Sequence, residues 1–498
     1  MEAMQVVKLV RAGRRPVRIG WFLLAGVVAC AVAACGSDGA TSSADAANPT
    51  AAIVTTPTPS KLRSGAGADP TAAPEAGRAD TSTTESAGEG DADAASTDSD
   101  ESVPPVPTAA PVAVPTPTPV VVYVSPDDDF RKLVNDYDEG TTFYIRAGVH
   151  LGDRAFPKAG QVFIGEPGAI FDGDGIGAPA FSATRKEGSD GVVIRDLEIR
   201  NYQPGRNNGA ISARPLDEDD LEGKNWTISG NVIHGNGGAG INVASGMVIE
   251  DNYIYDNRQI GISGLGSGER PLVDMVITNN TIEANNAAPY DEFEYHEGGI
   301  KLNGAASTEI TKNWIAGNWG FGLHCDRQCD DVLIEGNIVR DAKAHVGRDG
   351  DRAFAAEVYV ELSTNVTIRA NEVVVDESIP SGQRDKAIRV NESQNIVVEG
   401  NTLVLGDADA DHIMSLGFNS CCDRPPTSDT TFRNNTVEAV AGTILVGSRD
   451  IDPDGGNIVF EDNTYIERGG TFEFRHRAAP QTWTEWQDLG YDTAGTLR

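Results

Sequence analysis

Residues 226–233 read WTISGNVI, and this pattern, apolar-x-apolar-x-x-Asn-x-apolar, occurs nine times from there to the C-terminus. A tenth copy, VVIRDLEI at 192–199, carries Leu197 in place of the asparagine. Neighbouring copies of the asparagine are 21 to 34 residues apart, which predicts stacked units that are each too small to bury an apolar face alone. The nine asparagines are Asn231, Asn252, Asn280, Asn313, Asn337, Asn371, Asn401, Asn435 and Asn463.

The alternation of apolar and polar residues within each copy predicts two short strands joined at a bend. Asparagine suits the bend because it tolerates the left-handed backbone region and its amide hydrogen-bonds locally. Stacked copies would align these amides as a ladder. We therefore expect an all-β solenoid of parallel strands, with about ten coils from the ten copies.

The repeats resemble those of right-handed parallel β-helix proteins of the pectate-lyase-like superfamily, over about residues 121–498. The resemblance implies a right-handed parallel β-helix. It does not select a reaction, because the superfamily includes polysaccharide lyases, uronate epimerases, glycoside hydrolases and non-enzymatic adhesins.

Residues 1–35 are typical of an export signal, with a basic start, an apolar run at 19–34 and small residues before Cys35. The run is shorter than the roughly 20 residues that cross a bilayer. Small residues directly before a cysteine resemble a bacterial lipoprotein signal. That resemblance implies lipidation of Cys35, an extracytoplasmic location and membrane attachment through the lipid only. Ordinary secretion with an incidental cysteine is the alternative.

Residues 36–120 consist largely of Ala, Thr, Ser, Pro, Gly and Asp. Such a segment cannot bury enough apolar surface to offset chain entropy, so we predict a disordered tether. The formal net charge of the whole chain is −34, although its first 35 residues are basic. This acidic balance argues against nucleic acids and anionic membranes as partners. We expect a monomer.

Both ends of the solenoid carry sequences typical of a cap. Ser125 is predicted to begin a helix, with Pro126 in its first turn. The apolar face of this helix would plug the first coil and consists of Phe130, Leu133, Val134 and Tyr137. At the far end, Trp483 and Trp486 predict a second cap and are interpreted as structural rather than sugar-binding.

Four cysteines, Cys325, Cys329, Cys421 and Cys422, fall within the solenoid region. An even set in an exported domain permits disulfides. Three rungs separate the two pairs in our alignment, or roughly 14 Å, which is too far for a bridge. Local pairing is therefore expected.

If each coil has two strands, the candidate site residues lie on the second strand of four coils. These strands read GGIKLNG, FGLHCDR, EVYVELS and KAIRVNE. Aligning their inward apolar residues leaves two columns of exposed, outward side chains on successive rungs. One column is Lys301, His324, Tyr359 and Arg389, and the other is Asn303, Asp326, Glu361 and Asn391.

Insertions at 284–299, 341–356 and 376–386 precede these strands and are predicted to form a wall beside the columns. Tyr295 and Glu297 of the first insertion are expected to bind substrate, together with Asn303 and Asn391 of the second column.

The succession EGGIK, GFGLHCD and VELS also resembles a pattern in uncharacterised secreted bacterial β-helix proteins. The positions that carry over are Glu297, Lys301, Asp326 and Glu361. In that pattern a tryptophan is more usual where this chain has His324.

Lyases and epimerases of uronic acids must neutralise a carboxylate, remove the neighbouring proton and supply an acid. Lys301 and Arg389 are candidates for neutralisation, and His324 and Tyr359 are candidates for base and acid. Asp326 and Glu361 are candidate ligands for Ca²⁺ that bridges to the substrate. The hypothesis is a lyase or epimerase that acts on a uronic-acid-containing polysaccharide.

Three alternatives stay open from the sequence. Asp326 and Glu361, roughly 5 Å apart by rung spacing, approach the carboxylate separation of a retaining glycoside hydrolase. In the second alternative, the chain is a non-catalytic, glycan-binding surface lipoprotein. In the third, the stacked charges simply pair on a solvated sheet face.

Overall fold

The computed structural model describes most of the predicted solenoid. The described residues are 120–183, 188–214, 223–287, 297–343, 355–375, 385–406, 412–417, 426–440, 442–446, 456–469, 471–477 and 479–498. Cys35 and nearly all of the predicted tether, as well as Tyr295, Cys421 and Cys422, lie outside the described residues. Among the described helices, none has the length and apolar character needed to cross a bilayer.

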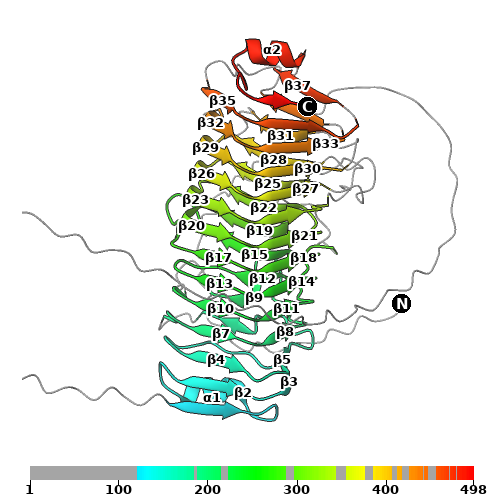
Figure 1. Ribbon diagram of the computed structural model, residues 1–498. Helices are drawn as coiled ribbons and strands as arrows, with labels where there is room; N and C mark the ends of the chain where they lie inside the picture. Colours follow the sequence, from blue (N-terminus) through cyan, green and yellow to red (C-terminus); the bar gives the residue numbers. More distant parts are fainter. Residues whose placement is uncertain are drawn as a thin grey trace, which may run out of the picture. The chain divides into compact units, whose positions relative to one another are not determined.

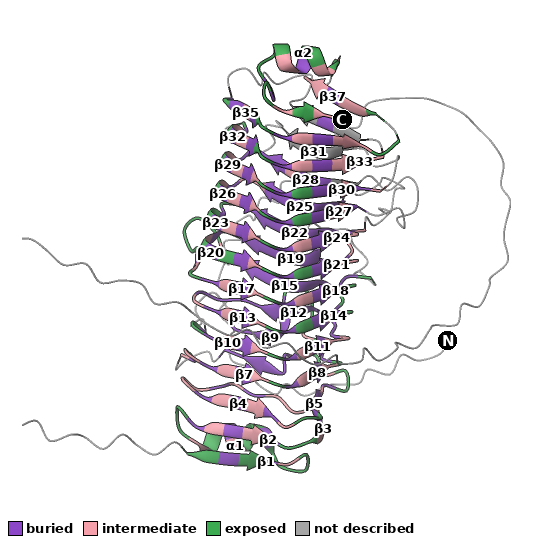
Figure 2. Cartoon of the chain, in the orientation of Figure 1, coloured by how far each residue is buried: buried purple, intermediate pink, exposed green. Residues whose placement is uncertain are grey.

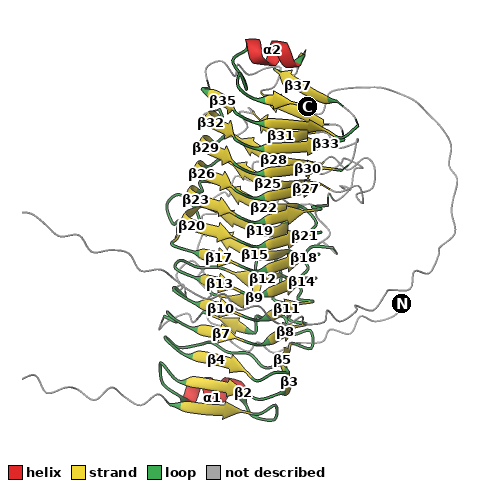
Figure 3. Ribbon diagram, viewed as in Figure 1, coloured by secondary structure: helices red, strands yellow, loops and turns green. Residues whose placement is uncertain are grey.

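Three parallel sheets, here called sheets A, B and C, run along the solenoid (Figure 1, Figure 3). Sheet A follows the order β1 (Val121–Val124), β2 (Thr142–Ile145), β4 (Val162–Gly165), β7 (Val193–Arg195), β10 (Thr227–Ser229), β13 (Val248–Glu250), β17 (Val276–Thr278), β20 (Ala305–Thr311), β23 (Asp330–Glu335), β26 (Thr364–Arg369), β29 (Gln394–Glu399), β32 (Ser428–Arg433) and β35 (Ile458–Glu461), with β16 (Leu272–Val273) also paired to β20.

Sheet B follows the order β3 (Gly148–Leu151), β5 (Ala169–Asp172), β8 (Glu198–Arg200), β11 (Val232–His234), β14 (Tyr253–Tyr255), β18 (Thr281–Glu283), β21 (Trp314–Ala316), β24 (Ile338–Arg340), β27 (Glu372–Val375), β30 (Thr402–Leu405), β33 (Thr436–Ala439), β36 (Thr464–Glu467) and β39 (Thr496–Leu497). Sheet C consists of β6 (Phe181–Ser182), β9 (Gly209–Ser212), β12 (Ala239–Asn242), β15 (Ile260–Leu265), β19 (Gly298–Asn303), β22 (Phe321–Asp326), β25 (Ala355–Glu361), β28 (Asp385–Asn391), β31 (His412–Gly417), β34 (Gly442–Val446), β37 (Phe472–His476) and the antiparallel β38 (Ala479–Gln481).

The predicted solenoid of parallel strands is confirmed, with two corrections. Each asparagine repeat supplies a strand of sheet A and a strand of sheet B, so the candidate site lies on the third strand of each coil and not on the second. The solenoid also exceeds the ten repeats, because strands β1 to β6 precede the first copy at 192–199. Those early strands lack the Asn pattern, which is why the repeat count missed them.

The core is built by stacking like residues on successive rungs. In sheet A, Ile228 pairs with Ile249, which pairs with Ile277 and then Ile310, and all four are fully buried. Buried and less buried positions alternate along the strands of this sheet and of sheet B (Figure 2). The alternation read from the sequence therefore gives the inward face of each strand.

The asparagine ladder is confirmed between sheets A and B. Asn337 is typical: its Oδ1 accepts from the backbone N–H and the amide of Asn313, at 2.9 and 3.0 Å. Its own Nδ2 donates to Ile310 O at 2.8 Å and to Asn371 Oδ1 at 3.0 Å. The ladder ends at Asp492, whose Oδ1 accepts from Asn463.

A second, shorter ladder lies between sheets B and C and was not predicted. Its amides hydrogen-bond in sequence from rung to rung at 2.9–3.0 Å. Each member lies five residues after an asparagine of the first ladder, so a signal was present in the sequence. The members are Asn236, Asn257, Asn285 and Asn318.

Both ends are capped by a short helix. The first, α1 (Phe130–Asp136), buries Phe130 and Val134 as predicted. Its N-cap is Asp129, which accepts from the backbone of Lys132, so the prediction that Ser125 caps this helix was wrong. Ser125 instead begins the turn before it. The second helix, α2 (Trp483–Asp488), buries Trp486 and is consistent with the structural reading of the tryptophans.

Local disulfide pairing is confirmed for Cys325 and Cys329, whose Cα atoms are 6.0 Å apart. Cys325 lies on the inward face of β22, one residue from both His324 and Asp326. The bridge therefore ties the turn after β22 to the strand that carries two candidate site residues.

Candidate functional site on sheet C

The strand register of sheet C places the predicted first column on consecutive rungs. Lys301 pairs with His324, His324 with Tyr359, and Tyr359 with Arg389. In the second column Asn303 pairs with Asp326, and Glu361 pairs with Asn391. The alignment of the four strands from sequence was therefore correct.

The prediction that these columns are exposed was wrong. Lys301 is 1% exposed, His324 0% and Tyr359 1%, although their strand neighbours Leu323 and Val358 fill the core on the opposite face. One reason is Phe321, whose ring centroid lies 4.5 Å from that of His324 and 5.3 Å from that of Tyr359. The predicted wall falls largely outside the described residues.

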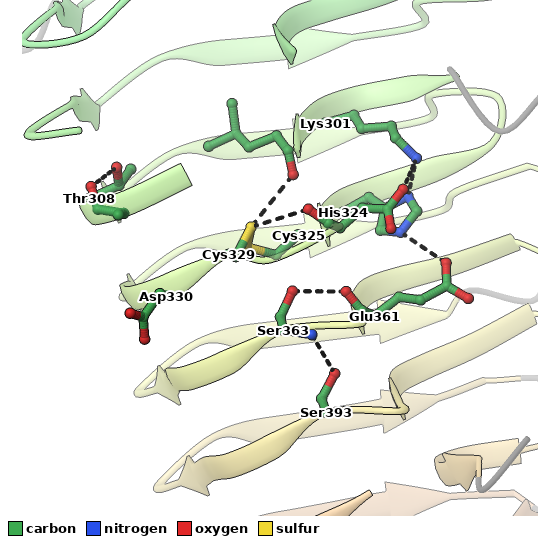
Figure 4. The surroundings of a disulfide bond; sticks show 12 residues. Lys301, Thr308, His324, Cys325, Cys329, Asp330, Glu361, Ser363 and Ser393 are labelled. Carbon is green, nitrogen blue, oxygen red and sulfur yellow. Dashed lines mark hydrogen bonds and ion pairs between the residues drawn. A yellow bond between two sulfur atoms is a disulfide. The ribbon is translucent and has the colours of Figure 1, made fainter. Parts of the chain in front are cut away.

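Lys301 and Asp326 form a buried ion pair, with Nζ and Oδ2 2.8 Å apart. The same Nζ lies 3.1 Å from Nδ1 of His324 (Figure 4). An ammonium group only donates hydrogen bonds, so Nδ1 is the acceptor and the imidazole proton sits on Nε2. That proton faces Oε2 of Glu361, 3.6 Å away.

The imidazole of His324 is held neutral. Burial lowers its pKa, and the positive charge of Lys301 lowers it further, against the opposing effects of Glu361 and Asp326. A neutral imidazole with one ring nitrogen as acceptor is the form that takes up a proton.

Both carboxylates of the second column are ionised near neutral pH. Burial opposes ionisation of Asp326, but the charge of Lys301 and its hydrogen bond to Asp326 outweigh it and lower the pKa of Asp326 to about 2. Burial likewise opposes ionisation of Glu361, but the nearby imidazole N–H of His324 helps to lower the pKa of Glu361 below its usual value.

Tyr359 is a protonated phenol between two other site residues. Its ring stacks on His324, with centroids 4.6 Å apart, and the Arg389 guanidinium lies 5.0 Å from the ring centroid. Burial raises the pKa of Tyr359 well above its ordinary value, despite the opposing charge of Arg389. Its hydroxyl hydrogen-bonds to Glu361.

Glu297, which the sequence suggested as a substrate contact, has a property that the sequence did not reveal. The residue is 6% exposed, and burial raises the pKa of its carboxyl to about 8, against the opposing effects of Asn286 and Lys301. Its Cβ sits against Gly320, where an added side-chain carbon would approach it to 2.6 Å. Glu297 is therefore a carboxylic acid that keeps its proton at neutral pH.

The second column has the donor chemistry of a hard cation. Asp326 and Glu361 offer carboxylate oxygens within 4.8 Å of each other. Asn303 Oδ1 and Asn391 Oδ1 are buried oxygens without a hydrogen-bond partner among the described residues. Calcium takes such oxygen ligands. His324 belongs to the same geometric group, but its Nε2 carries a proton and is not available as a ligand in this tautomer.

Comparison with known proteins gives the family context of this geometry. Residues 221–403 match the family model described as the right handed beta helix region. The structure resembles that of XylC in complex with xylose, with a TM-score of 0.50 and 13% identity over 71% of this chain and 84% of that chain. This chain is a right-handed parallel β-helix protein.

Two further proteins are similar to this chain. The A-module of mannuronan C-5 epimerase AlgE4 from Azotobacter vinelandii aligns with a TM-score of 0.47 and 15% identity over 74% of this chain and 91% of that chain. The uncharacterized protein YclG of Bacillus subtilis (strain 168) is 24% identical over 297 residues, or 55% of this chain. The alignment spans 44% of the length of YclG. At these identities the structural likenesses show the fold alone.

Proposed function

We propose that the β-helix is a carbohydrate-active enzyme that removes the proton next to the carboxylate of a uronic acid in a polysaccharide, as a lyase or an epimerase does. The observation that carries the proposal is the neutral imidazole of His324, which lies between the cation Lys301 and the protonated phenol Tyr359. Proton abstraction needs these three kinds of group together. The fold by itself names no reaction.

In this mechanism Lys301 turns from His324 to the carboxylate of the sugar, with Arg389 as a second cation. The lone pair of His324 Nδ1 is then free to accept the proton from the sugar. Glu361 accepts the hydrogen bond from Nε2–H and stabilises the imidazolium that forms, as a carboxylate does in a catalytic triad.

The hydroxyl of Tyr359 supplies the proton for the leaving oxygen in a lyase, or for the opposite face of the sugar in an epimerase. Glu297, protonated at neutral pH, is a second proton donor beside Lys301. Because His324 and Tyr359 are buried, a sugar reaches them only if Phe321 and the other groups packed around them shift. When these groups return around the bound sugar, they exclude water from the reacting groups.

Calcium is a proposed cofactor. Asp326 and Glu361 would hold the ion, with an amide oxygen of Asn303 or Asn391. A bound cation supplies neutralisation of the substrate carboxylate.

Glycoside hydrolysis by Asp326 and Glu361 is less well supported. A hydrolase requires one of its two carboxyl groups to be protonated when the other is ionised. Here the pKa values of both groups are lowered. The spacing of the two side chains therefore satisfies the geometry and not the protonation states.

The test is to incubate the purified protein with a panel of uronate and neutral polysaccharides, with calcium and with a chelator. Elimination is read from the ultraviolet absorbance of an unsaturated uronate, and epimerisation from deuterium uptake at C5 in heavy water. Hydrolysis gives new reducing ends without either signal. Binding without any of the three would leave a non-catalytic glycan-binding protein and refute the proposal.

Tyr359→Phe and His324→Gln are expected to lower turnover by roughly 10²–10⁴-fold, the usual share of a general acid or base. Because both residues are buried, we expect both substitutions to lower the stability of the fold as well. Exposed positions, as predicted from the sequence, would have implied no such effect. The turnover of each variant is therefore expressed per folded molecule before it is compared with the wild type. Ser263→Ala, one rung before Lys301 in the same column, is the matched control and should keep wild-type turnover.

A further inference from the structure

Sheet B carries an aromatic surface that the proposed reaction does not use. We call it the sheet B platform, and it spans the consecutive strands β11, β14, β18 and β21 (Figure 1). Tyr253 is 39% exposed and Trp314 is 37% exposed, which is high for residues with such large apolar rings. The platform consists of His234, Tyr253, Tyr255, Glu283 and Trp314.

The rings of the platform support one another. Tyr253 and Tyr255 are stacked with centroids 4.5 Å apart, and Tyr255 stacks on His234 at 4.6 Å. The guanidinium of Arg340 lies 6.0 Å from the centroid of the Trp314 ring, at the opposite end of the platform. The rings of His234, Tyr255 and Tyr253 therefore form one continuous surface on β11 and β14, and Trp314 lies apart from them on β21.

Glu283 fixes the two exposed rings. Tyr253 donates its hydroxyl to Oε2 of Glu283 at 3.1 Å, and Trp314 donates Nε1–H to Oε1 at 2.9 Å. The polar end of each ring is thus tied to one carboxylate, and the exposed part of each ring remains for contact with a ligand. Side chains held in this way lose little conformational entropy on binding.

The spacing of the rings suits an extended ligand. Tyr253 pairs with Thr281, and Thr281 pairs with Trp314, so the two rings are two rungs apart. Two rungs of a sheet correspond to about 10 Å. Thr281 and the Glu283 carboxylate lie between them, so the strip between the two rings is polar.

We propose that the sheet B platform binds a neutral polysaccharide, with two of its sugar rings packed on Tyr253 and Trp314. The apolar face of a pyranose ring packs on an aromatic ring, and the remaining lone pairs of the Glu283 carboxylate accept hydrogen bonds from sugar hydroxyls. The proposal is independent of the reaction at sheet C and adds a second, non-catalytic glycan site.

Charge selects this occupant over others. The carboxylate of Glu283 lies between the two rings and would repel an anionic sugar packed on them. A dry interface with a second copy would desolvate the Glu283 carboxylate without a cation to pair with it. A net charge of −34 disfavours an anionic membrane surface.

The test is retardation of the full-length protein in native gels that contain a neutral polysaccharide, either glucomannan or xylan, or the uronate polymer polygalacturonate. Retardation by at least one neutral polymer is expected, and any retardation by polygalacturonate through sheet C should be the same in the wild type and the platform variants. Trp314→Ala and Tyr253→Ala should each weaken the retardation at least tenfold in polymer concentration. Tyr123→Ala removes a ring that is 56% exposed on sheet A and serves as the matched control with no change.

Three results would overturn the proposal. One is retardation by neither neutral polymer, and another is equal retardation of the wild type and both platform variants. The third is a change in sedimentation coefficient on Trp314→Ala, which would show that the platform joins two copies of the chain. Because the readout is binding, failure of the sheet C activity assays leaves the result interpretable.

Discussion

Lys301 is a buried charge that depends on its ion-pair partner. Its ammonium group is 1% exposed and pairs with Asp326. Removal of one partner would leave an uncompensated charge in a low-dielectric environment, at a cost of about 3–5 kcal/mol. The variants chosen for testing the reaction therefore keep Lys301 and Asp326 and change the neutral groups.

Glu297 gives a prediction about pH. Its pKa is about 8 in the folded protein, against roughly 4.3 in an unfolded chain. Between these values the folded state holds a proton that the unfolded state has lost, so the stability contributed by this group falls as pH rises.

Glu297→Gln removes this titration. The unfolding free energy of the variant relative to wild type should rise by on the order of a few kcal/mol between pH 5 and pH 8. Urea melts at the two pH values measure the change. Glu372→Gln, at an exposed position on sheet B, is the control. A difference that is the same at both pH values would mean that Glu297 is ionised in the folded protein.

The amide ladder gives a prediction about stability. Asn337→Ala leaves Ile310 O and Asn371 Oδ1 each without the donor that Asn337 Nδ2 supplied, and it removes the acceptor for Asn313. We expect a loss of about 1–3 kcal/mol in unfolding free energy, measured by urea denaturation. Thr402→Ala, exposed on sheet B, should change it far less. A loss near zero would mean that water replaces the lost hydrogen bonds.

At the scale of single residues, the sequence predicted the direction of each side chain correctly but not its burial. The alternation around Lys301, His324 and Tyr359 places all three on the outward face, because side-chain direction depends only on the strand period. Their burial depends on Phe321 and on chain from other coils, which no local pattern reports. The protonated state of Glu297 was missed for the same reason, since its pKa is raised by burial.

At the scale of elements, the caps close the open ends of the sheets. The α2 helix begins with a capping box between Thr482 and Glu485. Its Trp486 packs on Phe460 and Phe474, with ring centroids 5.2 Å away in each case. The helix covers the last rung, which would otherwise present apolar side chains and unpaired strands to solvent.

Trp486→Ala should therefore cost about 3–5 kcal/mol in unfolding free energy, as expected for the loss of a large buried ring. Loss of the cap should also expose β35 and β37 and increase aggregation on heating, measured by light scattering. Leu489→Ala, in a residue that is 44% exposed, should change stability little. Equal stability of the two variants would show that α2 does not act as a cap.

The elements also show why the two-strand interpretation of a coil failed. The asparagine repeat marks sheets A and B, because its bend recurs between them on every rung from β10 and β11 to β35 and β36. The described strands of sheet C share no residue that recurs in all of them, and they follow loops of different lengths. The second ladder, from Asn236 to Asn318, supplies a mark between sheets B and C in only four coils. A third strand in every coil was therefore hard to detect from period alone.

At the scale of the whole molecule, the stacked sheets separate two kinds of surface. Sheet C carries a buried cluster with paired charges, which suits chemistry on an anionic sugar. Sheet B carries exposed rings around a carboxylate, which suits retention of a neutral one. If both proposals hold, a single solenoid would bind a mixed polysaccharide at one sheet and act on it at another. The repeat makes this arrangement possible, because every coil contributes a strand to both sheets.

The prediction that the protein is anchored outside the cytoplasm rests on residues 1–35. We propose that Cys35 is lipidated after cleavage, because small residues and an apolar run precede it directly. Cys35→Ser should then release the mature protein from the membrane pellet and abolish incorporation of labelled palmitate in the native host. Cys30→Ser, within the apolar run itself, is the matched control and should keep both. If the Cys35 variant stays in the pellet, another part of the chain anchors the protein, and the lipoprotein interpretation of residues 1–35 is wrong.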